Sequence, residues 1–270
     1  MKYINIKLTT KILLGFLMTF LMGGCQDVIE LELKESERRF VIEANLDAGA
    51  GAIQVLISKS GSFYQETDFE KISGATVLLN VDNNLSYQLL ETQPGSYTWD
   101  TLSIQPGDTA FLTVALLSGE QFSAMAICPM PTGLDSLELN PVVAPFSNDT
   151  IYQLLYNFQD PIGVKSYYRT KVRLNGGFLD GYLLFDDEGQ DGEYIKIPFF
   201  GPPFEADDTL DVQLFAVDKE YYDYFTEVDD AGSAGLGSSV PYNPNGNFTP
   251  EVLGFFGIWY KTELRIITPL

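Results

Sequence analysis

The chain has 270 residues, with 16 lysines and arginines against 37 aspartates and glutamates, and its formal net charge is −21 at pH 7. A charge of this sign repels phosphate backbones, so we expect no nucleic-acid partner. The chain contains no histidine, which excludes Ser-His-Asp and Cys-His catalysis and most transition-metal sites. We therefore expect a protein that is not an enzyme and has no cofactor.

The first residues have the pattern of an export signal. Three lysines accompany an apolar run, Ile12–Met22, which is shorter than the about 20 residues that a membrane-spanning helix needs. The run ends at Gly23-Gly24-Cys25, which resembles the lipobox at which bacterial lipoproteins are cleaved. We expect residues 1–24 to be a lipoprotein signal peptide and Cys25 to carry lipid. An ordinary secretory signal is the alternative.

The next part of the chain reads as strands. Segments such as GAIQVLISKS, GATVLLNVD and TAFLTVALL alternate apolar and polar residues between turns, which is typical of an antiparallel sandwich. We expect residues 25–36 to be an acidic tether and residues 37–131 to form an N-terminal β-sandwich. Cys128 falls on the apolar face of the last such run, so we expect a small buried residue. With Cys25 lipidated, no disulfide is expected within the chain.

Two prolines and a glycine in PMPTGLDS favour a linker, so we expect residues 132–270 to form a C-terminal β-rich domain. Within it, the apolar residues of DKEYYDYFTEVDD have helical spacing, and Asp218 is a suitable N-cap. A long exposed loop is predicted between residues 231 and 248. The expected fold is mainly β, with two antiparallel β-sandwich-like modules (immunoglobulin- or transthyretin-like) and one short helix in the second.

Six segments carry a resemblance to a known family: CQDVIELEL, ISGATVLLNVD, FQDPIGVKSYYRTKV, LFDDEGQDGEYIKI, VDKEYYDYFTEV and NGNFTPEVLGFFGIWY. In these segments and their order, the chain resembles a lipoprotein family of the Bacteroidota catalogued as domain of unknown function 4249. The resemblance spans essentially the whole chain after Cys25. One departure lies near the end, where FTPEVLGFF stands in place of an Asn-Ile-Glu-Gly-like segment.

The resemblance implies a role beside a membrane transporter. Members are similar to accessory lipoproteins of TonB-dependent outer-membrane receptors, so such a receptor is an expected partner, together with the membrane itself through the N-terminal lipid. Asp27, Glu30 and Glu32 look like the export tag of surface lipoproteins. The expected location is therefore the outer membrane, facing the cell surface. The alternative for these acids is a solvated tether with no export role.

An acidic segment, LFDDEGQDGEY, holds Asp186, Asp187, Glu188 and Asp191 within one turn region. Carboxylate oxygens suit calcium, but the spacing fails the EF-hand rule, because Gly189 and Pro198 replace acids that the loop requires. We favour a solvated acidic hairpin with no metal and keep calcium as a weak candidate.

Aromatic residues crowd two segments that are also rich in proline and glycine. Rings on rigid loops can contact sugars, peptides or a partner protein at little entropic cost. The alternative is that these rings fill the base of the second module. The candidate binding residues are Phe199, Phe200, Phe204, Tyr242, Phe248, Phe255, Phe256, Trp259 and Tyr260.

Five triplets of the form Asp-Ser/Thr-apolar resemble the O-glycosylation motif of exported Bacteroidota proteins. The alternative is that each marks the start of a strand, where a turn aspartate precedes the first residue. The candidate hydroxyls are those of Thr101, Thr109, Ser136, Thr150 and Thr209.

Together these features predict a lipid-anchored outer-membrane lipoprotein that binds a ligand or serves as an accessory component of TonB-dependent nutrient uptake. A structural or adhesive surface lipoprotein is the first alternative. The second is a hydrolase that uses two carboxylates, which would need a cleft holding two buried acids, one of them with a raised pKa.

Overall fold

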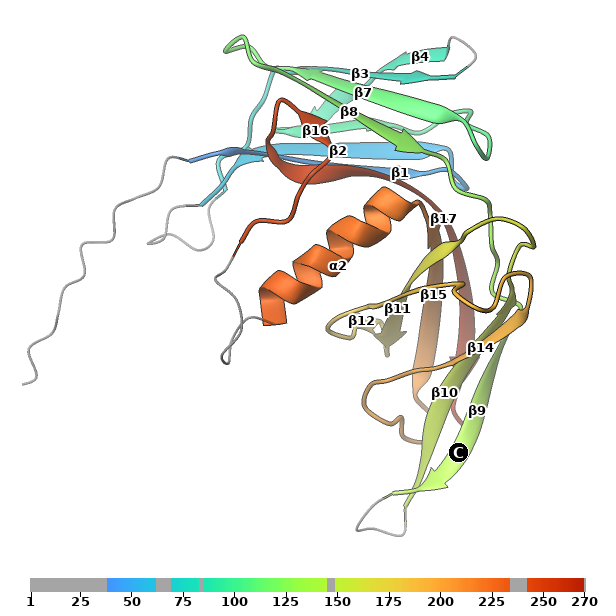
Figure 1. The fold of residues 1–270 in the computed structure, drawn as a ribbon. Helices are drawn as coiled ribbons and strands as arrows, with labels where there is room; N and C mark the ends of the chain where they lie inside the picture. Colours follow the sequence, from blue (N-terminus) through green and yellow to red (C-terminus); the bar gives the residue numbers. More distant parts are fainter. Residues whose placement is uncertain (1–37, 62–68, 83–84, 145–148, 234–241, 270) are drawn as a thin grey trace, which may run out of the picture. The chain divides into compact units, whose positions relative to one another are not determined.

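The computed structural model describes residues 38–61, 69–82, 85–144, 149–233 and 242–269, which lie in a compact unit formed by Glu37–Leu270. The expected signal peptide, Cys25 and the acidic tether lie outside the described residues. The expected mainly β fold is confirmed: antiparallel sheets dominate, with one helix (Figure 1). No helix in the described part of the chain is long and apolar enough to cross a membrane.

The largest sheet has nine strands, and its order mixes early and late parts of the chain. Along it run β12 (Gly177–Phe178), β11 (Tyr167–Leu174), β15 (Thr209–Val217), β17 (Leu253–Ile267), β1 (Phe40–Asp47), β2 (Ala52–Lys59), β6 (Ser96–Trp99) and β5 (Leu90–Gln93), while β13 (Leu183–Asp186) pairs with β11.

A first core lies between the β1 end of this sheet and a five-stranded sheet. The five strands run in the order β16 (Phe248–Thr249), β8 (Gln121–Ile127), β7 (Thr109–Ala115), β3 (Thr76–Val81) and β4 (Leu85–Gln88). Residues of β8 alternate strictly between exposed and buried, as the sequence pattern predicts. Cys128 is 2% exposed in this core, which confirms the expected burial.

A second core lies between the β11 end of the nine-stranded sheet and a three-stranded sheet. The latter has the order β14 (Tyr194–Pro198), β10 (Thr150–Gln159) and β9 (Ser136–Val143). Leu154, Tyr156 and Phe158 of β10 are fully buried here, as are Val212 and Leu214 of β15.

Strand β17 belongs to both halves. Its first part, Leu253–Trp259, pairs in parallel with β1, and its second part, Trp259–Ile267, pairs antiparallel with β15 (Figure 1). Phe256 and Ile258 enter the first core, while Leu264 and Ile266 pack against the second. The boundary expected near residue 131 stays a prediction, and the structure adds that one strand joins the two cores.

The helix α2 (Lys219–Ser233) forms where the spacing predicts it. Asp218 caps it, since its Oδ1 accepts a hydrogen bond of 2.7 Å from the Tyr221 amide. Tyr221 is 2% exposed and its ring meets those of Phe255 and Trp259, so the predicted apolar stripe packs on β17. The loop predicted between residues 231 and 248 falls partly outside the described residues.

Candidate functional site

The loop Phe199–Pro203 separates two adjoining cavities. The first, which we call the Lys171 cavity, has a volume of about 380 Å³ and is lined by this loop, by Tyr156 and Thr170, and by residues 179–183. The second, of about 390 Å³, lies between the loop and the outer ends of β9 and β10. Phe199, Gly201 and Pro202 line both cavities. Their volumes fall in the range of small-molecule sites.

The loop is fixed at both ends to β10. The Phe199 amide donates to the Leu154 carbonyl at 2.8 Å, and Tyr152 and Phe204 exchange backbone hydrogen bonds of 2.9 and 3.2 Å. The Phe199 and Phe204 rings stack with centroids 5.3 Å apart. A Cβ atom on Gly201 would lie 2.1 Å from the Phe199 ring, so a larger residue here would require that ring to move. Backbone hydrogen bonds to β10 therefore hold both ends of the wall between the cavities.

The polar residues that line the Lys171 cavity include Tyr156, Thr170, Lys171 and Asp180, the last of them on the loop between β12 and β13. The hydroxyls of Tyr156 and Thr170 are 3.1 Å apart, and burial raises the pKa of Tyr156 to about 12, so its hydroxyl stays protonated. Burial, with a smaller contribution from Arg169, lowers the pKa of Lys171.

The nine predicted aromatic residues do not form one surface. Of those in the loop around the cavities, Phe200 is 79% exposed, Phe199 is half-buried and Phe204 is buried. The other six lie near or in the last strand. Tyr242 is exposed, Trp259 and Tyr260 are half-buried, and the rest pack in the cores: Phe248, Phe255 and Phe256.

This distribution leaves Phe199 and Phe200 as the predicted rings that line a cavity and keep an accessible face. The buried rings could meet a ligand only if the cores opened. Sequence reasoning missed the other contributors, Lys171 and Tyr182. No local sequence pattern marks these two residues as binding residues, because residues 179–183 and the loop Phe199–Pro203 come together only in the folded chain.

Part of the predicted acidic segment forms a cluster with an aspartate from elsewhere. Carboxylate oxygens of Asp160, Asp187 and Asp191 lie within 4.8 Å of one another. Asp160 and Asp187 are buried and Asp191 is exposed. Asp186 instead lies 3.3 Å from Lys165, and its Oδ1 accepts the Glu188 amide. An oxygen-only set suits calcium, so the calcium alternative stays a prediction, with Asp160 in the cluster and Asp186 and Glu188 outside it.

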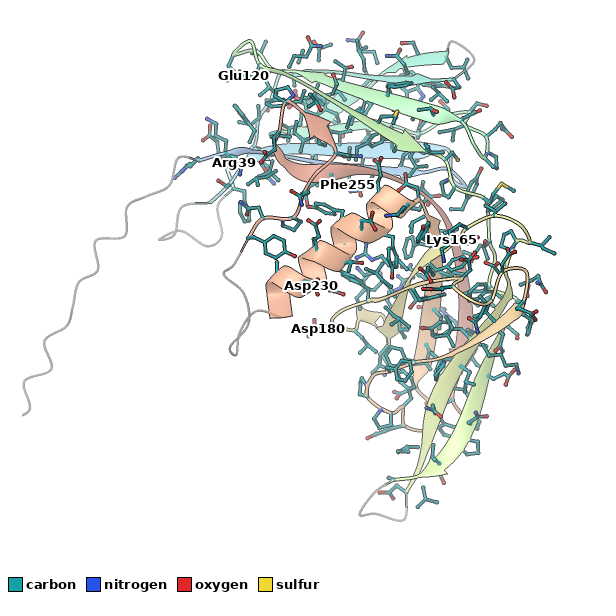
Figure 2. The ribbon with its side chains drawn as sticks, viewed as in Figure 1. Arg39, Glu120, Lys165, Asp180, Asp230 and Phe255 are labelled. Carbon is teal, nitrogen blue, oxygen red and sulfur yellow. The ribbon has the colours of Figure 1, made fainter. Side chains whose placement is uncertain are left out.

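The carboxylates of this cluster already have partners within the protein. Lys165 lies 2.7 Å from Asp187, which also accepts the Ser166 amide at 2.8 Å (Figure 2). Asp160 accepts the Gly192 amide at 2.9 Å and the Tyr168 hydroxyl. These bonds join the segment before β11 to the acidic hairpin.

A third cavity, of about 410 Å³, is lined by Cys128, Met130, Asp218 and residues at the start of β11. Burial raises the pKa of the Cys128 thiol to about 11, so it stays protonated at neutral pH. Burial also raises the pKa of Asp218 to about 6. Asp218 is the one carboxylate among the described residues that line this cavity, so the two-acid pair required for glycoside hydrolysis is not assembled here.

The candidate O-glycosylation residues differ in position. Thr109, Ser136, Thr150 and Thr209 each begin a strand, as the alternative explanation expects. Thr101 does not, so the expectation that all five mark strand starts is wrong for this residue, which lies exposed in an irregular segment. Whether any of them carries a sugar stays a prediction.

Comparisons with known proteins place the chain in a family. A family model described as a domain of unknown function (DUF4249) matches residues 26–265. A search of the curated proteins finds no match. Among solved structures, a chain titled "Cytokine receptor complex - Crystal form 1A" is similar at 9% identity, with 84% of this chain and 94% of that chain covered and a TM-score of 0.28. By the family match, the chain belongs to the DUF4249 family.

Proposed function

We propose that this protein is a Bacteroidota lipoprotein, anchored in the outer membrane through Cys25 and facing the cell surface. It captures a small ligand without chemistry, as an accessory component of TonB-dependent uptake. The observation that carries the binding role is the loop Phe199–Pro203, which is hydrogen-bonded to β10 at both ends and lines two adjoining cavities of about 380 and 390 Å³. The anchor rests on the sequence around Cys25, and the uptake role rests on the family resemblance.

The exposed ring of Phe200 supports ligand capture at this loop. An aromatic side chain that is 79% exposed adds no core packing, yet it stands at the mouth of the Lys171 cavity. Exposed aromatic rings on preformed loops offer a large contact area with few rotatable bonds. The loop is therefore the first place to test.

Binding is tested with glycan and peptide arrays probed with the full-length chain. We expect the Phe200→Ala variant to lose the array signal of the wild type. Phe111→Ala is the matched control, because Phe111 is also exposed, at 47%, but lies on β7 far from the loop in the sequence. Equal signals for Phe200→Ala and wild type would contradict the proposed loop. The alternative of a structural or adhesive lipoprotein predicts that same result.

The accessory role is tested by pull-down from native membranes with the tagged, lipidated protein and its Cys25→Ala variant. We expect a TonB-dependent receptor to copurify with the lipidated form and to be lost with the variant. Recovery of the lipidated form without a receptor would contradict the uptake role. The arrays would still test ligand capture by themselves.

A further inference from the structure

The second of the two cavities beside the loop Phe199–Pro203 differs from the Lys171 cavity in its charge. It has a volume of about 390 Å³ and lies against the ends of β9 and β10, and we call it the β9 cavity. Lys171 and Asp180 line the first cavity, whereas none of the described residues that line the β9 cavity is an acid or a base. In the chain as a whole, 20% of the residues are charged. The β9 cavity therefore offers no opposite charge to an ionic ligand.

Strand β9 brings apolar side chains to this cavity that are not buried in a core. Its last four residues, Asn140–Val143, are all exposed, whereas the residues of β8 alternate between exposed and buried. Neighbouring residues of a strand point to opposite faces, so Val142 and Val143 are exposed on both faces of β9, at 47% and 70%. Both valines line the β9 cavity. They add little burial to the folded chain and are available to an apolar ligand.

The rest of the lining is also mostly apolar. Ile151 is the cross-strand partner of Val142, and the loop adds a phenylalanine and two prolines. Of the described residues in the lining, Tyr152 and Gln153 are the two whose side chains can form hydrogen bonds. An ionised group would lose water here without gaining an opposite charge, which is unfavourable. An uncharged apolar group would instead gain free energy from burial.

We propose that the β9 cavity binds the uncharged, apolar part of a small ligand that is captured at the loop Phe199–Pro203. The inference rests on the proposed binding function and names the chemistry of the part of the ligand that enters this cavity. The missing opposite charge acts against cations and anions alike. The net charge of −21 acts further against anions, because it repels them before they reach the cavity.

Fluorescence titration tests the inference with two probes that share one ring system. N-phenylnaphthylamine is uncharged, and anilinonaphthalene sulfonate carries a sulfonate on the same rings. The full-length Cys25→Ala chain is used, because a lipid anchor would require detergent, which takes up both probes. We expect the uncharged probe to bind about tenfold more tightly than the sulfonate, since the sulfonate would lose water without gaining a partner.

A paired variant, Val142→Lys with Val143→Lys, adds positive charge beside the cavity on both faces of β9. Both side chains are exposed, so the fold should be retained. We expect the variant to bind the sulfonate about tenfold more tightly than wild type does, and the uncharged probe more weakly, which reverses the preference. The matched control is Leu90→Lys with Leu117→Lys, because these leucines are also exposed and do not line the cavity.

Three results would overturn the inference. Equal affinity of wild type for both probes, or no binding of the uncharged probe, would show that the cavity does not select uncharged apolar groups. An unchanged preference in the paired valine variant would show that the probes bind elsewhere. An equal shift in the leucine control would show that the preference comes from the net charge of the whole chain. In each case the arrays with Phe200→Ala test the proposed function separately.

Discussion

Asp218 joins two segments that are far apart in the chain. Its Oδ1 accepts the Tyr221 amide at 2.7 Å, and its Oδ2 accepts the Ile127 amide at 3.3 Å. Burial raises its pKa from 3.8 to about 6, although both hydrogen bonds act in the opposite direction. The side chain thus caps α2 and joins it to the end of β8. Burial of its charged form lowers the free energy of unfolding.

This residue predicts a specific pH dependence of stability. Because its pKa is higher in the folded state than in the unfolded state, its contribution is most favourable below pH 3.8 and is lost as the pH rises to about 6. The difference in unfolding free energy between wild type and Asp218→Asn should therefore change by about 2 kcal/mol between pH 4 and pH 7, since one pKa unit is worth about 1.4 kcal/mol. Urea unfolding at several pH values measures this difference.

Asp218→Asn also loses one hydrogen-bond acceptor. This loss lowers the free energy of unfolding of the variant by an amount that does not vary with pH. Asp135→Asn, at an exposed aspartate of the linker, is the control for general loss of negative charge. The prediction is contradicted if the difference in unfolding free energy between wild type and Asp218→Asn does not change from pH 4 to pH 7.

At the scale of elements, Arg169 connects α2 to the sheet beneath it. It leaves β11, donates a hydrogen bond to the Tyr221 hydroxyl and lies between Tyr182 and Phe225. The Tyr182 hydroxyl in turn donates to the Phe225 carbonyl at 3.0 Å. Helix, strand and the segment before β13 are therefore locked around one guanidinium, next to the wall of the Lys171 cavity.

Replacement of Arg169 by lysine keeps the charge and removes the flat group that stacks between two rings. We expect Arg169→Lys to lower the free energy of unfolding by about 1–2 kcal/mol, because lysine cannot stack in this way. Arg38→Lys, at an arginine with a 43% exposed side chain, should change it far less. Chemical denaturation measures both variants, and equal effects would show that stacking at Arg169 adds nothing.

Local patterns explain which elements could be predicted from the sequence. The alternation in β8 and the cap and stripe of α2 depend on residues within a few positions of one another, so they are visible in the sequence. The pairing of Phe256 with Ala44, and the meeting of Asp160 with Asp187, depend on distant segments that no local pattern links. The same reason hid the Lys171 cavity, whose walls come from β10, β11 and two loops.

At the scale of the molecule, β17 makes the two cores dependent on each other. Phe256 is fully buried in the first core, and the same strand continues past Trp259 to pair with β15, where Leu214 is fully buried in the second. Unfolding of the first core would remove β1 as the pairing partner of β17, and unfolding of the second would remove β15. Two cores joined by a continuous strand should lose their structure together.

We therefore expect one calorimetric unfolding transition for the full-length chain, with equal calorimetric and van't Hoff enthalpies. Phe256→Ala and Leu214→Ala should each lower the free energy of unfolding by about 3 kcal/mol, since each leaves a cavity in a closed core. Both should shift the same single transition to lower temperature. Independent modules on either side of residue 131 would instead give two transitions, with Phe256→Ala moving one and Leu214→Ala moving the other, and the shared strand would then be no more than a contact between neighbours.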